Sequence, residues 1–112
     1  MSAILTDPFV DLLASRLQAI AEPTRIRLLT ILEQHEATVQ ELTDELATTH
    51  QNVSKHLGVL RRSGIVSRRR CGNRVWYTLS DYSACRLIDQ ATASLTGYLE
   101  ELASIAGLDA AA

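Results

Sequence analysis

The stretch from Thr38 to Leu79 most constrains this chain, because two short helical patterns follow one another there with only a tight turn between them. Thr38, with Glu41 three positions later, forms a capping box that predicts the start of the first helix. Thr49 is the expected N-cap of the second helix, and Gly64 is expected to end that helix in a left-handed conformation. Each local signal agrees with the apolar spacing around it, so two short helices are predicted.

A two-stranded hairpin pattern follows the second helix directly. The residues predict a strand at 65–70, a turn at 71–73 and a returning strand at 75–79, in which apolar and polar side chains alternate. Helices in this order, followed by a hairpin, predict a mainly α fold with a small β-hairpin.

The same part of the chain carries a concentrated positive charge. Between Glu45 and Asp81 there is no acidic residue, although seven of the eleven Lys and Arg residues lie there. This segment carries +7, and the other four basic and thirteen acidic residues carry −9. The net charge is therefore only −2, although positive and negative charge are concentrated in different parts of the chain. A basic surface of this kind indicates a polyanion binder. The plainer alternative is a solvated Arg-rich surface.

The second helix of the motif, expected at about 50–62, has a polar face whose side chains can hydrogen-bond to base edges or phosphates. The candidate DNA contacts on this face are Gln51, Asn52, Ser54, Lys55 and His56. Arginines flank the hairpin tip, and such long, permanently charged side chains can follow a narrow minor groove. Because a recognition helix fits the major groove, the whole pattern predicts a winged helix-turn-helix domain that binds double-stranded DNA.

Two helical patterns precede the motif and one long pattern follows it. Asp7 is the expected N-cap of the first helix, and Pro23 starts the second, with Arg25 and Arg27 on its exposed side. The last helix, expected at 81–105, repeats apolar residues about every 3.5 positions, which suits packing on another long helix. No other long helix is predicted, so its best partner is the same helix of a second copy. Folding back over its own domain is the alternative.

The 112 residues fit one domain with the element order α-α-α-α-β-β-α. No signal peptide pattern opens the chain, and no apolar run approaches the ~18 residues of a membrane span. Two cysteines without a CxxC motif favour a reducing cytoplasm. The chain has no phosphate-binding glycine loop, no HExxH motif and no plausible catalytic triad, so we expect neither an enzyme nor a cofactor.

The runs AEPTRIRLLTIL (21–32) and VSKHLGVLRRSGIV (53–66), with the aromatic-containing hairpin, closely resemble the ArsR/SmtB family of bacterial repressors. The resemblance implies a homodimeric repressor that binds a palindromic operator through residues 38–79 and dimerises through helices at 7–21 and 81–105. It also maps family DNA contacts onto the recognition-helix residues named above and onto Arg70, Asn73 and Arg74 of the hairpin, or wing.

The chain departs from this family at both of the family's familiar metal sites. Thr38 and Gln40 stand where many members have a CxC motif, and neither supplies the thiolate that a soft metal needs. At the site in the last helix Asp81 is kept, but one carboxylate does not make a zinc site. The other three positions of that site are occupied by Ser83, Ser94 and Gly97. A metal ion is therefore not supported by the familiar motifs.

Two other readings stay open. A metal- or thiol-responsive repressor would use Cys71, at the wing tip beside arginines that favour a thiolate, or Cys85, early in the last helix. The plainer view makes Cys85 a packing residue and Cys71 incidental. His50 and His56 are disfavoured as paired metal ligands because, six residues apart on a helix, they do not share a face. The remaining reading is a winged-helix module for protein interaction.

Overall fold

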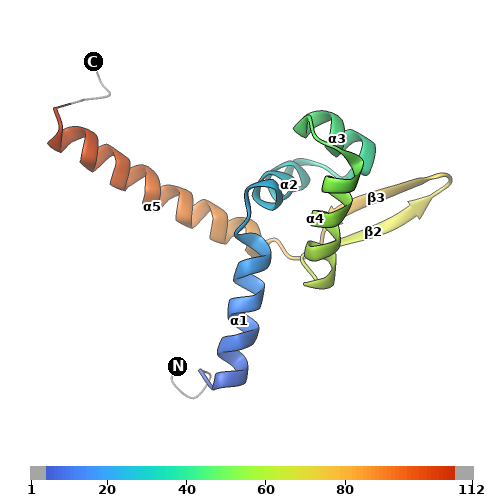
Figure 1. Cartoon of the computed structure of the whole chain (residues 1–112), viewed down its shortest axis with the longest axis horizontal. Helices are drawn as coiled ribbons and strands as arrows, with labels where there is room; N and C mark the ends of the chain where they lie inside the picture. The colour runs from blue at the N-terminus through green and yellow to red at the C-terminus, as the bar shows by residue number, and fades with distance from the viewer. Residues whose placement is uncertain (1–4, 108–112) are drawn as a thin grey trace.

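The computed structural model describes residues 5–107 and shows five helices with a small three-stranded sheet (Figure 1). In chain order the elements are α1 (Asp7–Ile20), α2 (Pro23–Gln34), β1 (Ala37–Thr38), α3 (Val39–Leu46), α4 (His50–Arg62), β2 (Val66–Cys71), β3 (Arg74–Leu79) and α5 (Ser83–Ile105). The body of the molecule contains α2, α3, α4 and the sheet, while α1 and α5 project from it in different directions (Figure 1). This order confirms the predicted winged helix-turn-helix fold.

The predicted helix caps of the helix-turn-helix are present in the structure. Thr38 Oγ1 accepts a hydrogen bond from the Glu41 N–H at 3.2 Å, and the Glu41 carboxylate accepts one from the Thr38 N–H at 3.0 Å, which completes the capping box. Thr49 Oγ1 accepts from the Asn52 N–H at 3.1 Å and so caps α4. These bonds satisfy N–H groups that have no partner inside the helix. Ala47 ends α3 with a left-handed φ of 52°, which keeps the turn to α4 short.

Two helix starts differ from the prediction. Thr6, not Asp7, is the N-cap of α1, and Asp7 is its first helical residue. α5 begins at Ser83 rather than at 81, because the Asp81 side chain accepts a hydrogen bond from the Ser83 N–H at 2.9 Å and therefore lies outside the helix.

The wing also differs from the prediction in two respects. Cys71 is part of β2 and pairs with Arg74, so the turn has two residues and includes Gly72 at a φ of +63°. The short strand β1 was not predicted. It pairs antiparallel with β3, placing Thr38 opposite Trp76, and gives the sheet the order β1-β3-β2. The wing is therefore joined to the start of α3 as well as to the end of α4.

The core lies beneath the inner face of α4. Its fully buried side chains come from α2, α3, α4 and the start of the wing, and the largest are Leu28, Leu29, Leu42, Val53, Leu57, Leu60, Ile65 and Val66. The three from α4 are those predicted to point inward. Because α4 is held by one face, its opposite face is left for a ligand.

The molecule is more extended than a compact domain of its length. Its radius of gyration is 17.4 Å, whereas a compact chain of this length has about 13 Å. The difference arises because α1 and α5 lie outside the body (Figure 1). Within residues 5–107, no helix is both long and apolar enough to cross a membrane.

Candidate nucleic-acid interface

The outward face of α4 presents fewer of the predicted DNA contacts than the sequence indicated. Gln51, Ser54 and Lys55 are exposed, as expected, whereas Asn52 is half-buried and His56 is buried. The three exposed residues lie near the N-terminal end of the helix, the part of a recognition helix that contacts base edges.

The expectation that His56 lies on the exposed face is wrong. Its side chain is directed inward because position 56 falls three residues after Val53 and four before Leu60, both of which are buried. Its Nδ1 lies 3.0 Å from Arg25 Nη1 and 3.5 Å from Glu22 Oε2. Burial lowers the pKa of His56; Glu22 opposes this, while the charges of Lys55 and Arg25 add to it. A neutral imidazole in this position accepts a hydrogen bond from Arg25, which has only donors.

Arg25 was expected on the exposed side of α2, and this is also wrong. The half-buried guanidinium donates from Nε to the Ala19 carbonyl at 2.6 Å and from Nη2 to the Gln18 carbonyl at 3.1 Å. With its bond to His56, it joins the last turn of α1 to the inner side of α4. The side chain of Glu22, the N-cap of α2, accepts from the Arg25 N–H at 2.9 Å and completes the junction.

The side chain of Asn52 is turned toward the loop before α4. Its Nδ2 donates to Thr48 Oγ1 at 3.2 Å, one helical turn earlier. Asn52 therefore lies at the flank of the recognition helix rather than at the centre of its exposed face.

The wing presents a row of exposed polar side chains. These are Arg68, Arg69, Arg70, Asn73 and Arg74. Arg69 differs from its neighbours because its Nη2 forms a 2.6 Å ion pair with Glu36, which raises the pKa of Arg69. Within the described residues neither Arg70 nor Arg74 forms an ion pair. These two arginines and Asn73 thus remain available near the wing tip, where a DNA contact was predicted.

The two cysteines occupy different environments, and both are free thiols. Cys85 is buried in the core, with its Sγ 3.9 Å from the Leu29 carbonyl oxygen. Burial first, and then the nearby carboxylates of Glu33 and Asp89, raise the pKa of the Cys85 thiol to about 11. Cys85 is thus buried, as the packing interpretation expects, whereas Cys71 is exposed on β2.

The positions that correspond to the familiar metal sites have other partners here. Asp81 binds Arg16 and Ser83, and hydrogen bonds from Ser83, followed by one from Arg16, lower the pKa of its carboxyl group. Gln40 Oε1 lies 2.6 Å from His50 Nε2. Across residues 5–107, no group of three or more His, Cys, Asp and Glu side chains is arranged to hold a metal ion.

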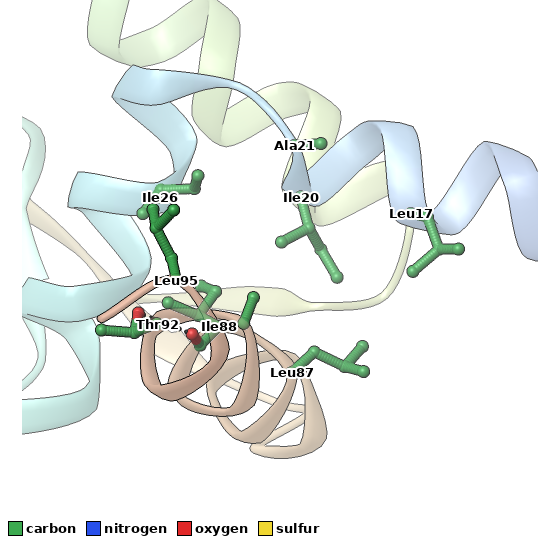
Figure 2. Close-up of a pocket in the computed structure, with 9 residues that line it drawn as sticks. Leu17, Ile20, Ala21, Ile26, Leu87, Ile88, Thr92 and Leu95 are labelled. Carbon is green, nitrogen blue, oxygen red and sulfur yellow. Dashed lines mark hydrogen bonds between the residues drawn. The ribbon is translucent and has the colours of Figure 1, made fainter. Parts of the chain in front are cut away.

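An apolar hollow of about 470 Å³ lies between α1, α2 and α5. Figure 2 shows Leu17 and Ile20 of α1 and Ile26 of α2 across from Leu87, Ile88 and Leu95 of α5. Exposed apolar side chains continue from this hollow along both projecting helices: Phe9, Val10, Leu12 and Leu13 on α1, and Tyr98, Leu99, Leu102 and Ile105 on α5. This surface is much more apolar than a solvated helix face requires.

Comparison with known proteins places the chain among DNA-binding regulators. A family model described as a helix-turn-helix domain matches residues 20–69. An uncharacterized HTH-type transcriptional regulator of Mycobacterium tuberculosis, Rv0081, is 32% identical over 101 residues, which cover 89% of each chain. The HTH-type transcriptional repressor SmtB of the same organism is 33% identical over 84 residues, covering 75% of this chain and 62% of that repressor.

Solved structures give the same result. The crystal structure of Rv0081 superimposes with a TM-score of 0.77 at 33% identity, covering 86% of this chain and 97% of the other. The solution structure of a homodimeric winged helix-turn-helix DNA-binding domain from Mycobacterium bovis, a possible ArsR-family regulator, gives a TM-score of 0.75 at 25% identity. That match covers 86% of this chain and 92% of the other.

Proposed function

The chain belongs to the ArsR/SmtB family of winged helix-turn-helix transcriptional regulators, and we propose that it is a homodimeric repressor whose α4 enters the major groove of a palindromic operator. The observation that carries this proposal is the outward face of α4. Gln51, Ser54 and Lys55 are exposed there on a helix that the core holds from its other side.

The chemistry of these three side chains supports base and phosphate recognition. Gln51 has the paired donor and acceptor that an adenine edge requires, Lys55 can reach guanine or a phosphate, and the Ser54 hydroxyl can bond to either. The wing adds Arg70, Asn73 and Arg74, which we assign to the neighbouring minor groove and its backbone. His56 is not assigned to DNA, because it is buried against Arg25.

The projecting helices support a homodimer. Exposed apolar side chains follow α1 and α5 and continue into the hollow between them (Figure 2), and a second copy offers the same surfaces in return. The homologous domain from Mycobacterium bovis is homodimeric. A twofold dimer would present two recognition helices to two half-sites about 34–36 Å apart, which is why we propose a palindromic operator.

The residues at the familiar metal positions bear on the signal to which the repressor responds. Thr38, Gln40 and Asp81 take part in local hydrogen bonds, and this favours a member of the family without the familiar metal sites. A thiol response through Cys85 is disfavoured by its burial and raised pKa, whereas the exposed Cys71 remains a candidate. We propose no cofactor. We place the protein in the cytoplasm, where a bacterial repressor meets its operator.

The direct test is selection of duplexes from a random library by the purified protein, followed by titration of the selected duplex. Combined replacement of Gln51, Ser54 and Lys55 by Ala should abolish binding of this duplex and leave a folded protein, because all three side chains are exposed. Selection of no consensus sequence would contradict the regulator assignment and favour a protein-interaction module. Unchanged affinity of the triple variant would contradict the assignment of the groove.

A further inference from the structure

A polar hollow of about 260 Å³ lies between α2, the turn of the helix-turn-helix and the N-terminal half of α4. Its lining consists of Thr24, Arg27, Leu46, Ala47, Thr48 and Asn52. Of these residues only Asn52 was among the predicted DNA contacts, and the structure turns that side chain away from the centre of the exposed face.

Four of the six lining residues, Thr24, Arg27, Thr48 and Asn52, have side chains that can donate hydrogen bonds, and no carboxylate is among the six. Arg27 is exposed, and within residues 5–107 it forms no ion pair. Thr48 Oγ1 accepts from Asn52, so the Thr48 hydroxyl hydrogen is free to be donated elsewhere. An arginine with threonine hydroxyls and an amide beside it matches the donor set that proteins use for backbone phosphates.

The position of the hollow fits a phosphate of bound DNA. An α-helix with its side chains is about 10–12 Å across and fills a major groove about 12 Å wide. The elements that flank a recognition helix therefore lie close to the two phosphodiester backbones. Asn52 is rotated by about 100° around the helix from the exposed Gln51, so the hollow borders the DNA-facing surface directly.

We propose that this hollow binds a backbone phosphate of the DNA duplex, with Arg27 as its principal contact and Thr48 and Asn52 as supporting donors. The proposal rests on the proposed function, since it takes α4 as the helix that enters the groove. It assigns Asn52 to the backbone rather than to an adenine. Because a phosphate is the same at every base pair, the contact contributes affinity and fixes the register of the protein without reading sequence.

The experiment compares full-length wild type with Arg27→Gln, Arg27→Lys and a matched control, Arg86→Gln, which removes the same charge from an exposed site on α5. Each protein is titrated with two probes over a series of salt concentrations. One probe is the duplex selected by the wild type, and the other is a scrambled duplex of equal length and composition. Circular dichroism and light scattering establish that each variant has the fold and mass of the wild type.

We expect Arg27→Gln to weaken binding to both duplexes by the same factor and to reduce the slope of log K against log salt by about one for each protomer. Arg27→Lys should keep the slope and lose part of the affinity, and Arg86→Gln should behave as wild type. Replacing the contacted phosphate by an uncharged methylphosphonate, found by scanning the backbone of the selected duplex, should weaken wild type but not Arg27→Gln.

Three outcomes would overturn the proposal. Wild-type affinity and salt slope in Arg27→Gln would show that the hollow holds no phosphate. A loss confined to the selected duplex would show that Arg27 reads a base. A methylphosphonate effect of equal size in wild type and Arg27→Gln at every position would show that Arg27 contacts no phosphate. Failure of the proposed function looks different, because wild type would then select no duplex and the triple replacement at Gln51, Ser54 and Lys55 would change nothing.

Discussion

Arg25 Nη1 donates to His56 Nδ1 across 3.0 Å, and through this contact the residue that holds the end of α1 also holds the recognition helix. α1 and α5 carry the proposed dimer surface, whereas α4 carries the proposed DNA surface. The pair is thus a direct link between the two surfaces.

Replacing Arg25 by Lys tests how much this link contributes to the stability of the protein. The variant keeps the positive charge, but an ammonium group cannot reproduce the planar fork that bonds to Ala19, Gln18 and His56 together. We expect the free energy of unfolding to fall by about 1–3 kcal/mol, measured by urea denaturation. Arg27→Lys, at an exposed position of the same helix, should change it by less than about 0.5 kcal/mol. Equal losses in the two variants would remove the special role given to Arg25.

The stability of the protein should depend on pH through His56. Its pKa in the folded protein is lowered from the ordinary value of 6.5, so the unfolded chain binds a proton more readily. The stability contributed by neutral His56 is therefore complete above pH 6.5 and is lost as the pH falls toward the folded pKa. We expect wild type to lose more unfolding free energy than His56→Gln between about pH 7.5 and 5.5.

The pH dependence can be assigned to His56 only if the groups that face it do not change charge over the same interval. Arg25, Lys55 and Glu22 are the charged groups that act on the imidazole. Burial would raise the pKa of Glu22, but the Arg25 N–H and the charges of His56 and Arg25 together lower it from 4.5, so Glu22 stays ionised between about pH 7.5 and 5.5. Parallel stability profiles for wild type and His56→Gln would show that the imidazole does not titrate differently in the folded chain.

A charge placed on the apolar side of α5 should dissociate the proposed dimer. Leu99→Glu puts a carboxylate among exposed apolar side chains that a second copy would cover, and burying an unpaired charge is strongly unfavourable. Sedimentation or light scattering should give the mass of one chain for this variant. Ala93→Glu adds the same group on the opposite side of the exposed helix and should keep the wild-type mass. A dimer that survives Leu99→Glu would mean that other surfaces join the copies.

The two thiols should react at very different rates. Cys71 is exposed, whereas Cys85 is buried and its pKa is raised to about 11. With Ellman's reagent near neutral pH, the folded protein should release about one equivalent rapidly, and Cys71→Ser should remove that phase, because thiolate access controls the rate. In denaturant both cysteines should react. Rapid reaction of Cys85 in the folded Cys71→Ser variant would show that its site opens readily.

Local signals made much of this fold predictable. The capping box at Thr38 and Glu41, the cap at Thr49 and the left-handed Gly64 lie within a few residues of the bonds that they form, so they act whatever surrounds them. The inward positions of α4 followed from helical spacing for the same reason. The missed strand β1 had no such signal, because two residues become a strand only when β3 lies beside them.

The sequence by itself determined the order of the elements, the basic character of the wing and the existence of an outward polar face on α4, because each depends on residues close together in the chain. The tertiary structure decided which side chains occupy that face. Whether His56 points to DNA or to Arg25, and whether Asn52 lies beside Arg27, depends on where α2 packs against α4. That packing brings together residues some 25–31 positions apart, whose contacts no local periodicity specifies.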